Sequence, residues 1–115
     1  MELCAIMKRC GIVVILNFAL ALSAQDPPSP RVPDSTTAVA IAGAAARKIY
    51  GKRQIDYEEP LTALLANGVW IVHGTLCCPD RNGKRVCEIG KCVGGVVEVK
   101  VRQRDGKILS MTHGK

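Results

Sequence analysis

Four cysteines lie close together in the second half of the chain, and their spacing is the clearest sign of chemistry in the sequence. Cys77 and Cys78 are adjacent, and Cys87 and Cys92 follow. In an exported protein, an even number of cysteines in one short segment predicts disulfides. Adjacent cysteines rarely bridge each other without strain, so Cys77 pairs with either Cys92 or Cys87, and Cys78 takes the other. We favour the nested pairing, Cys77 with Cys92 and Cys78 with Cys87, because a hairpin narrows towards its tip.

The same thiols have two other possible uses, in a zinc site and in a redox-active pair. Structural zinc sites are usually built from C-x2-C pairs, and the spacing CC-x8-C-x4-C contains none. Disulfides are therefore the preferred interpretation. Each one should add about 2–4 kcal/mol to the stability of a small domain, whose core buries a modest fraction of its surface.

Two histidines and a group of carboxylates are the other candidate acids and bases. His73 and His113 approach each other if their strands are neighbours, but a metal or acid–base site needs a third group. The sequence contains no nucleophile elbow, phosphate loop or spaced metal ligands, so it predicts no cofactor. We therefore interpret each histidine as a polar residue at a strand end. Gly94 and Gly95 form too short a run to cradle a phosphate, and instead allow a bulge or a close approach of two backbones.

The acidic residues Asp56, Glu58 and Glu59 lie in a connection between two apolar segments. Nothing pairs with them at a readable spacing, so a solvated acidic loop is preferred to a catalytic carboxylate site. We also expect a short strand over residues 54–57.

The element that organises these residues is a predicted β-hairpin over residues 61–76, LTALLANGVWIVHGTL. Two apolar runs flank Asn67-Gly68, which is the strongest short-range signal for a type I′ turn. This turn places Leu65 opposite Trp70 and, further along, Ala63 opposite Val72. Both faces of the hairpin are apolar near the turn, so we expect other parts of the chain to cover each face.

A helix that covers one face is predicted over residues 36–50, TTAVAIAGAAARKIY. Ser35, Thr36 or Thr37 can cap its start, and Gly51 can end it in a left-handed conformation. Small apolar residues recur at helical spacing and allow a close approach to a sheet. This stripe consists of Ala38, Ile41, Ala42, Ala45 and Ile49.

A second hairpin follows the cysteines. Val97, Val99 and Val101 alternate with charged residues, which is typical of a half-exposed strand. A three-residue loop at 104–106 places Val101 opposite Leu109 and Val99 opposite Met111, so that the apolar residues share one face. The sequence therefore predicts a single α+β domain over residues 36–115, with one N-terminal helix packed on a curved antiparallel sheet of about four strands.

The N-terminal segment, residues 1–24, has the pattern of a secretory signal peptide: Lys8 and Arg9, then an apolar run, then small residues. A transmembrane helix is the alternative, but the apolar run is shorter than the ~20 residues that span a bilayer. Cleavage after Ser23 or after Ala24 fits the small-residue pattern. We expect an exported product, periplasmic or secreted, with no membrane anchor after cleavage.

Residues 25–35 contain four prolines and no apolar periodicity, so we expect a disordered leader outside the fold. The whole chain has a formal net charge of +6. Its basic residues are scattered rather than gathered in a stripe with stacking aromatics, which argues against a nucleic-acid partner. Moderate charge on a small exported domain more often serves solubility and the steering of a partner.

The order of several segments resembles a known family. These are IYGKRQI, then a proline before the first hairpin, then NGVWIVHGTL, GGVVEVKV and the terminal DGKILSMTHGK. Over residues 38–115 the chain is similar to small immunity proteins of nuclear-transport-factor-2-like fold, which are found beside bacterial polymorphic toxins. The resemblance implies a non-enzymatic α+β domain that binds a cognate protein toxin and blocks it. The family pattern has a short link where this chain has its cysteine-rich segment, and it supplies no catalytic residues.

Two classes of function follow. The first is an exported toxin-neutralising protein, whose binding surface is the sheet and the cysteine-rich segment. That segment is basic, so an acidic patch on the partner and salt-sensitive association are expected. The second is a small enzyme or ligand-binding domain with His73 as its polar group, and a general role in the envelope is a third. The residues that we expect to face a partner are Arg81, Lys84, Arg85, Lys91, Trp70 and His73.

Overall fold

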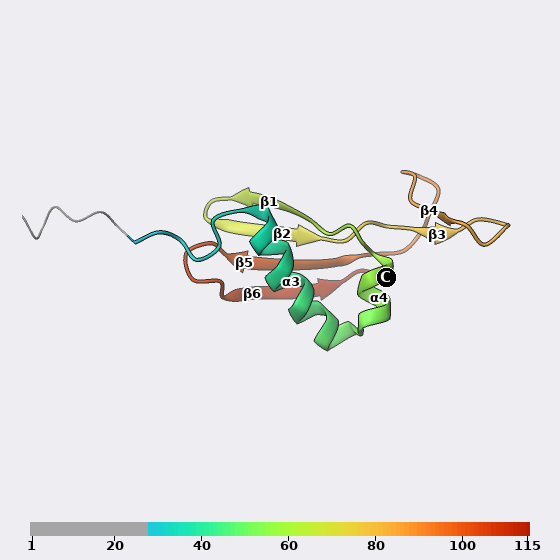
Figure 1. Ribbon diagram of the computed structural model, residues 1–115. Coiled ribbons are helices and arrows are strands. Elements are labelled where there is room, and N and C mark those ends of the chain that lie inside the picture. The colour runs from blue at the N-terminus through green and yellow to red at the C-terminus, as the bar shows by residue number, and fades with distance from the viewer. Residues whose placement is uncertain (1–27) are drawn as a thin grey trace, which may run out of the picture.

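A four-stranded antiparallel sheet carries a long helix across one face, and a small two-stranded ribbon projects from one end of the sheet (Figure 1). The computed structural model describes residues 28–115. The sheet has the strand order β1-β2-β5-β6 and the ribbon is β3-β4. The elements are α3 (Ser35–Tyr50), α4 (Lys52–Tyr57), β1 (Thr62–Ala66), β2 (Val69–His73), β3 (Cys78–Pro79), β4 (Arg85–Val86), β5 (Val97–Arg102) and β6 (Ile108–His113).

The predicted fold class, α+β with a helix on an antiparallel sheet of four strands, is confirmed, with a second short helix added. The predicted signal peptide lies outside the described residues. Within residues 28–115, no helix has the length and apolar character needed to cross a bilayer.

The central hairpin has the predicted register. Leu65 pairs with Trp70 and Ala63 with Val72. Asn67 and Gly68 have φ angles of 51° and 76°, the two positive values that a type I′ turn requires. The strongest local signal in the sequence therefore fixes the centre of the sheet.

Only one face of the sheet is covered by the described residues. Val72, Val99 and Val101 are buried beneath α3, whereas Leu64, which points the other way, is 67% exposed. The expectation that both faces are covered is wrong here. β5 explains the difference, because Glu98 and the other charged residues of this strand alternate with the buried valines and make the opposite face compatible with water.

Helix α3 packs closely because its buried stripe has no bulky side chain. Ala38, Ala42 and Ala46 are buried, while Ile49, which we expected on the stripe, is 67% exposed. Figure 1 shows the C-terminal turns of α3 extending past β6, so there is no sheet beneath this end.

The two ends of α3 differ in how well the sequence predicts them. The N-cap is Asp34, whose carboxylate accepts a hydrogen bond from the Thr37 N–H at 2.8 Å, so the expected caps at residues 35–37 are wrong by at least one position. Gly51 ends the helix with a φ of 96°, as predicted.

The leader is not wholly outside the fold. Val32 is completely buried, and its N–H donates to the Gln103 carbonyl at 3.0 Å. The Val32 carbonyl accepts a hydrogen bond from the indole N–H of Trp70 at 2.8 Å. The prediction that all of residues 25–35 lie outside the fold is therefore wrong for Arg31 and Val32, which bond to the loop between β5 and β6, and for Asp34 and Ser35, which begin α3. One apolar side chain between prolines is too short a signal for periodicity to detect.

The strand expected over residues 54–57 is wrong, since these residues belong to helix α4. The Ile55 N–H donates to the Gly51 carbonyl, and Lys52 forms an ion pair with Asp56 one turn later. Ile55 is fully buried. A single buried apolar residue in six gives neither a helical nor an alternating pattern, which is why the sequence did not reveal this helix.

The second hairpin has the predicted pair Val99–Met111, but Val101 pairs with Ile108 rather than with Leu109. The Arg102 N–H donates to the Lys107 carbonyl, so the loop has one residue more than predicted. Leu109 forms a bulge that absorbs the extra residue and restores the register.

The hydrogen bond from Trp70 to Val32 yields a stability prediction. Trp70→Phe removes the indole donor and leaves a buried carbonyl unpaired, so the free energy of unfolding should fall by about 1–3 kcal/mol. Urea titration measures this. Leu64→Ala is the control and should change the stability by less than about 0.5 kcal/mol. Equal effects of the two substitutions would contradict the assignment of Trp70 to the core.

Candidate functional site

The segment from Cys77 to Cys92, here called the cysteine loop, extends beyond the end of the sheet as the ribbon β3-β4 and a following arm (Figure 1). Two disulfides link residues within the loop. Cys77 is bonded to Cys87, with a Cα–Cα distance of 4.1 Å, and Cys78 is bonded to Cys92, with a Cα–Cα distance of 5.7 Å. The predicted disulfide framework is thus present, but the nested pairing that we favoured is wrong.

The register of the ribbon explains the pairing. Cys78 lies opposite Val86, so Cys77 falls opposite Cys87 on the next rung, and Cys78 is left for Cys92. The turn of the ribbon is centred on Asn82, and the next residue, Gly83, has a φ of 82°. Asn82-Gly83 is itself a turn signal, and it could have located the centre of this ribbon and hence the pairing.

The cysteine loop does not derive its order from burial. No side chain between residues 77 and 93 is buried. The main local bonds are the two disulfides, the two-rung ribbon and the Asp80 carboxylate, which accepts from the N–H groups of Asn82 and Lys84 at 2.8 and 2.9 Å. The loop is therefore held by covalent links and hydrogen bonds, in contrast to the rest of the domain.

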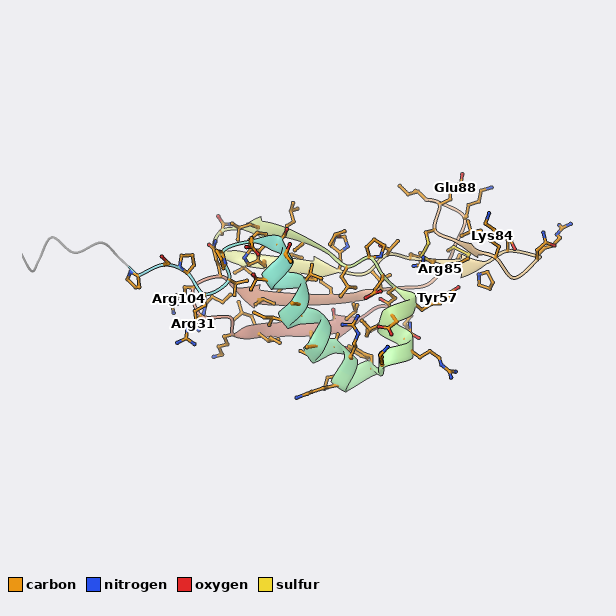
Figure 2. All side chains as sticks on the ribbon, in the orientation of Figure 1. Arg31, Tyr57, Lys84, Arg85, Glu88 and Arg104 are labelled. Atoms are coloured by element: carbon orange, nitrogen blue, oxygen red, sulfur yellow. A yellow bond between two sulfur atoms is a disulfide. The ribbon has the colours of Figure 1, made fainter. Side chains whose placement is uncertain are left out.

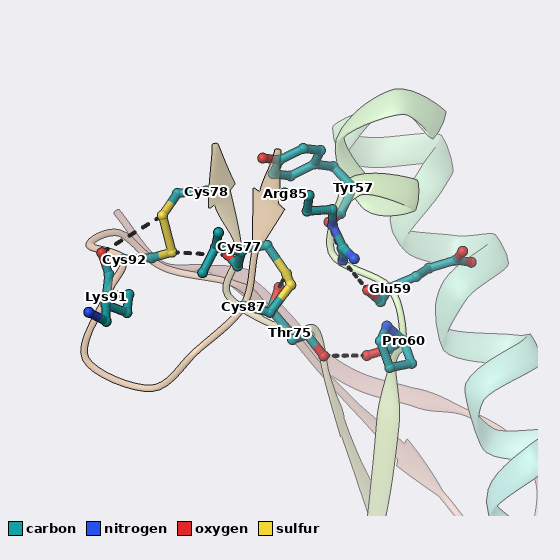
Figure 3. The surroundings of a disulfide bond; sticks show 11 residues. Tyr57, Glu59, Pro60, Thr75, Cys77, Cys78, Arg85, Cys87, Lys91 and Cys92 are labelled. Atoms are coloured by element: carbon teal, nitrogen blue, oxygen red, sulfur yellow. Dashed lines mark hydrogen bonds between the residues drawn. A yellow bond between two sulfur atoms is a disulfide. The ribbon is translucent and has the colours of Figure 1, made fainter. Parts of the chain in front are cut away.

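Arg85 fastens the cysteine loop to α4 (Figure 3). Its guanidinium donates to the carbonyl of Tyr57 at 2.9 Å and also to the carbonyl of Glu59. It lies 5.5 Å from the centre of the Tyr57 ring, a distance typical of a cation–π contact. Nearby, the Thr75 hydroxyl donates to the Pro60 carbonyl at 2.7 Å. Arg85, which was predicted to face a partner, is exposed and also anchors the loop to the end of α4.

The other predicted basic residues of the loop are exposed: Arg81, Lys84 and Lys91. Within residues 28–115, none of the three forms an ion pair. Figure 2 shows Lys84 and Glu88 on the two projecting parts of the loop, away from the sheet. These cations are therefore available to an acidic partner.

Trp70 and His73 do not join this surface. Trp70 is 8% exposed and its ring belongs to the core, so it has almost no surface to offer the partner that we predicted for it. His73 is exposed at the end of β2, with its Nδ1 3.3 Å from the Gly74 carbonyl oxygen. The two side chains lie on opposite faces of β2, because they are three residues apart, and so they form no common pocket.

An open groove of about 750 Å³ separates α4 from the base of the cysteine loop. Asp56 and Glu59 at its edge both form ion pairs with Arg47 of α3, at 2.9 and 2.7 Å. These two acidic residues were predicted to lie in a solvated loop, but both also form ion pairs with a helix of the domain. The groove is lined by Lys52, Arg53, Asp56, Tyr57, Glu59 and Arg85.

Glu58 departs further from that prediction, because it is buried and only 3% exposed. One carboxylate oxygen accepts from the Val97 N–H at 2.8 Å. The other accepts from the Gln54 amide at 2.8 Å and from His113 Nε2 at 2.5 Å. The sequence reasoning missed this cluster, since Glu58 and His113 are 55 residues apart and no local spacing connects them.

Glycines make room for the Glu58 cluster and for the C-terminus. A Cβ atom on Gly74 would lie 2.6 Å from a Glu58 carboxylate oxygen, and one on Gly95 would lie 2.2 Å from the Gly114 backbone. The close backbone approach expected at Gly94 and Gly95 is thus confirmed at Gly95.

Each member of the pair favours the charged form of the other, as the directions of their pKa shifts show. Burial raises the pKa of Glu58, but the hydrogen bonds from Gln54, Val97 and His113 outweigh it and hold that pKa below its usual range. The hydrogen bond to Glu58 raises the pKa of His113. The second ring nitrogen of His113 lies 2.8 Å from the Gly114 carbonyl oxygen, so both nitrogens face acceptors, as suits a protonated ring.

With the geometry established, comparison with known proteins identifies the family. A family model described as NTF2 fold immunity protein matches residues 37–115. The chain belongs to this family. No curated protein and no solved structure matches it. The matched range includes α3 from Thr37 onward, all of α4, the whole sheet, the cysteine loop and the terminal residues that contain His113.

In this NTF2 fold immunity protein, the Glu58–His113 pair has the composition of an acid–base dyad but the environment of a structural one. Both carboxylate oxygens already accept hydrogen bonds, and the His113 ring packs on Tyr50 with 5.2 Å between ring centres. The carboxylate accepts three hydrogen bonds from within the domain and is only 3% exposed, so a substrate has little access to it. The pair therefore joins α4 to the C-terminal strand.

The stability of this immunity protein should depend on pH through that pair. The lowered pKa of Glu58 adds stability above its ordinary value of 4.5, which is lost as the pH falls through the folded value. The raised pKa of His113 adds stability below its ordinary value of 6.5, which is lost as the pH rises through the folded value. The two contributions coincide between these ordinary values, so His113→Phe should cost most there, about 1–3 kcal/mol.

Urea unfolding from pH 4 to pH 9 measures this effect. His73→Phe is the matched control, because His73 is exposed and lies on the same sheet. Parallel pH profiles for the two variants would exclude a stabilising pair at His113.

The Arg85 anchor yields a separate prediction. Arg85→Gln should free the cysteine loop from α4 while leaving both disulfides intact, so the amides of residues 77–92 should exchange hydrogen about tenfold faster. Lys84→Gln, one residue away and without these contacts, should have little effect. Hydrogen exchange followed by mass spectrometry compares the two, and unchanged exchange in Arg85→Gln would show that the anchor does not order the loop.

Proposed function

We propose that this protein is exported and neutralises a protein toxin by binding it, without catalysis. The observation that carries the proposal is the match of residues 37–115 to the NTF2 fold immunity protein family. Immunity by binding needs a rigid, accessible surface rather than a set of reactive groups. The Glu58–His113 pair, in which the carboxylate is buried and bonded to groups of the domain itself, supports a role without catalysis.

The disulfides support the proposed location. Disulfides form and persist in oxidising compartments outside the cytoplasm, and the cysteine loop has two of them with no buried side chain to order it otherwise. Together with the signal-peptide pattern of residues 1–24, they favour a periplasmic or secreted protein. The partner is then a toxin that acts, or arrives, outside the cytoplasm.

The cysteine loop is the surface that we assign to the toxin. Its exposed cations Arg81, Lys84 and Lys91 favour an acidic partner and an association that weakens with salt. Its disulfides restrict the loop before binding, which lowers the entropy that is lost on association.

Co-expression tests the proposal. The protein encoded by the adjacent gene is directed to the periplasm, and growth is measured with and without this immunity protein. The full chain should restore growth, whereas a chain that lacks residues 1–24 should not, although it contains the whole family domain. If the full chain gives no protection against that protein, the proposed function is wrong for this pair.

A further inference from the structure

Two large apolar side chains of the cysteine loop region lie in water. Ile89 is 100% exposed and Val93 is 95% exposed, more than any other large apolar side chain in residues 28–115. Single exposed apolar residues are common on protein surfaces and need no explanation. Ile89 and Val93, however, are both almost completely exposed and lie within one short arm, so their exposure needs an explanation.

The arm that carries them, residues 88–93, is fixed at two points. Cys87 precedes it and is bonded to Cys77, while Cys92 lies within it and is bonded to Cys78. Between these points the Lys91 N–H donates to the Glu88 carbonyl at 3.1 Å, and Gly90 has a φ of 84°. Ile89 is therefore presented on a closed turn between two disulfides rather than on a free loop.

The charges around the arm indicate what it contacts. Lys91 lies between Ile89 and Val93 in the chain, and Arg81 and Lys84 are on the neighbouring ribbon turn. Glu88 is the one acidic residue of the arm, and the other carboxylate of the loop, that of Asp80, is occupied by backbone N–H groups. The arm thus presents two apolar groups among an excess of cations.

We propose that residues 88–93 are the anchor by which this protein holds its toxin, with Ile89 and Val93 entering an apolar pocket that has carboxylates at its rim. This inference rests on the proposed function and names the residues that supply most of the binding energy. Apolar side chains that become buried at the centre of an interface supply most of its affinity, whereas charges at the rim govern encounter and specificity. In this arrangement Lys91 forms ion pairs with the carboxylates at the rim of the toxin's pocket.

The open face of the sheet provides the comparison. Leu64 on that face is 67% exposed, and it lies on a strand of regular structure, with no disulfide near it. Leu64 therefore represents the sheet face, the other binding surface that the sequence suggested, and substituting it tests that face against the arm.

Binding measurements with purified proteins test the inference. The probe is the protein encoded by the adjacent gene, in a catalytically inactive form, and calorimetry gives the Kd. The double substitution Ile89→Ser with Val93→Ser should weaken binding about 100-fold, since each side chain that is buried at an interface contributes about tenfold or more. Lys91→Glu should weaken it about tenfold at low salt and less at high salt. Leu64→Ser should stay within about twofold of the wild type.

The outcomes separate the two claims. If the wild-type chain neither binds nor protects against this probe, the proposed function fails, and the anchor fails with it. If the wild type binds and protects while the double variant binds equally well, the anchor alone is overturned. The anchor is also overturned if Leu64→Ser causes the larger loss, or if the double variant changes only the self-association of the chain in sedimentation. Thermal unfolding and mass analysis of the double variant should show an unchanged fold and two intact disulfides, because neither side chain is buried.

Discussion

The buried carboxylate of Glu58 is the interaction on which the arrangement of the molecule most depends. It joins the end of α4, the first residue of β5 and the last residue of β6, and its own backbone carbonyl accepts from Thr75 at 2.7 Å. These segments are distant in sequence, and although Ile55, Val97 and Met111 bring all three into one apolar core, Glu58 is the polar group that bonds to each of them. A buried charge with several matched donors tolerates little displacement, so it sets position more sharply than apolar packing does.

The position of the cysteine loop follows from this carboxylate through one intermediate. Glu58 fixes the C-terminal end of α4, and the carbonyls of Tyr57 and Glu59 on either side of it are the acceptors of Arg85. Arg85 in turn orients the ribbon from which residues 88–93 emerge. A contact surface that is proposed to work by rigid presentation thus derives its orientation from a charge that is buried inside the domain.

The parts of this structure that the sequence predicts are those determined by neighbours in the chain. Asn67-Gly68 determines the register of β1 and β2 because the turn chemistry and the alternation act over a few residues. The alanine-rich helix and its glycine end are local in the same sense. The disulfide pairing also had a local signal, Asn82-Gly83, but the general shape argument for nesting took no account of where the ribbon turns.

The remaining features depend on contacts that the chain makes only after folding. Val32 is isolated among prolines in the sequence, and it becomes part of the fold through its hydrogen bond with Trp70, 38 residues away. Glu58 resembles its exposed neighbours until His113 and Val97 surround it. Arg85 and Lys84 are adjacent basic residues, and only the approach of α4 makes Arg85 an anchor and leaves Lys84 without such contacts. In the candidate site, sequence therefore predicted the disulfides and the basic character, but not which cations are available.

The chain enters the domain at one end of the sheet, where Val32 is bonded beside the loop between β5 and β6, and the cysteine loop projects from the other end (Figure 1). Residue 28, where the described chain begins, is therefore separated from the cysteine loop by the length of the sheet. A support that holds the domain at residue 28 leaves the opposite end, with its loop, accessible to the proposed partner.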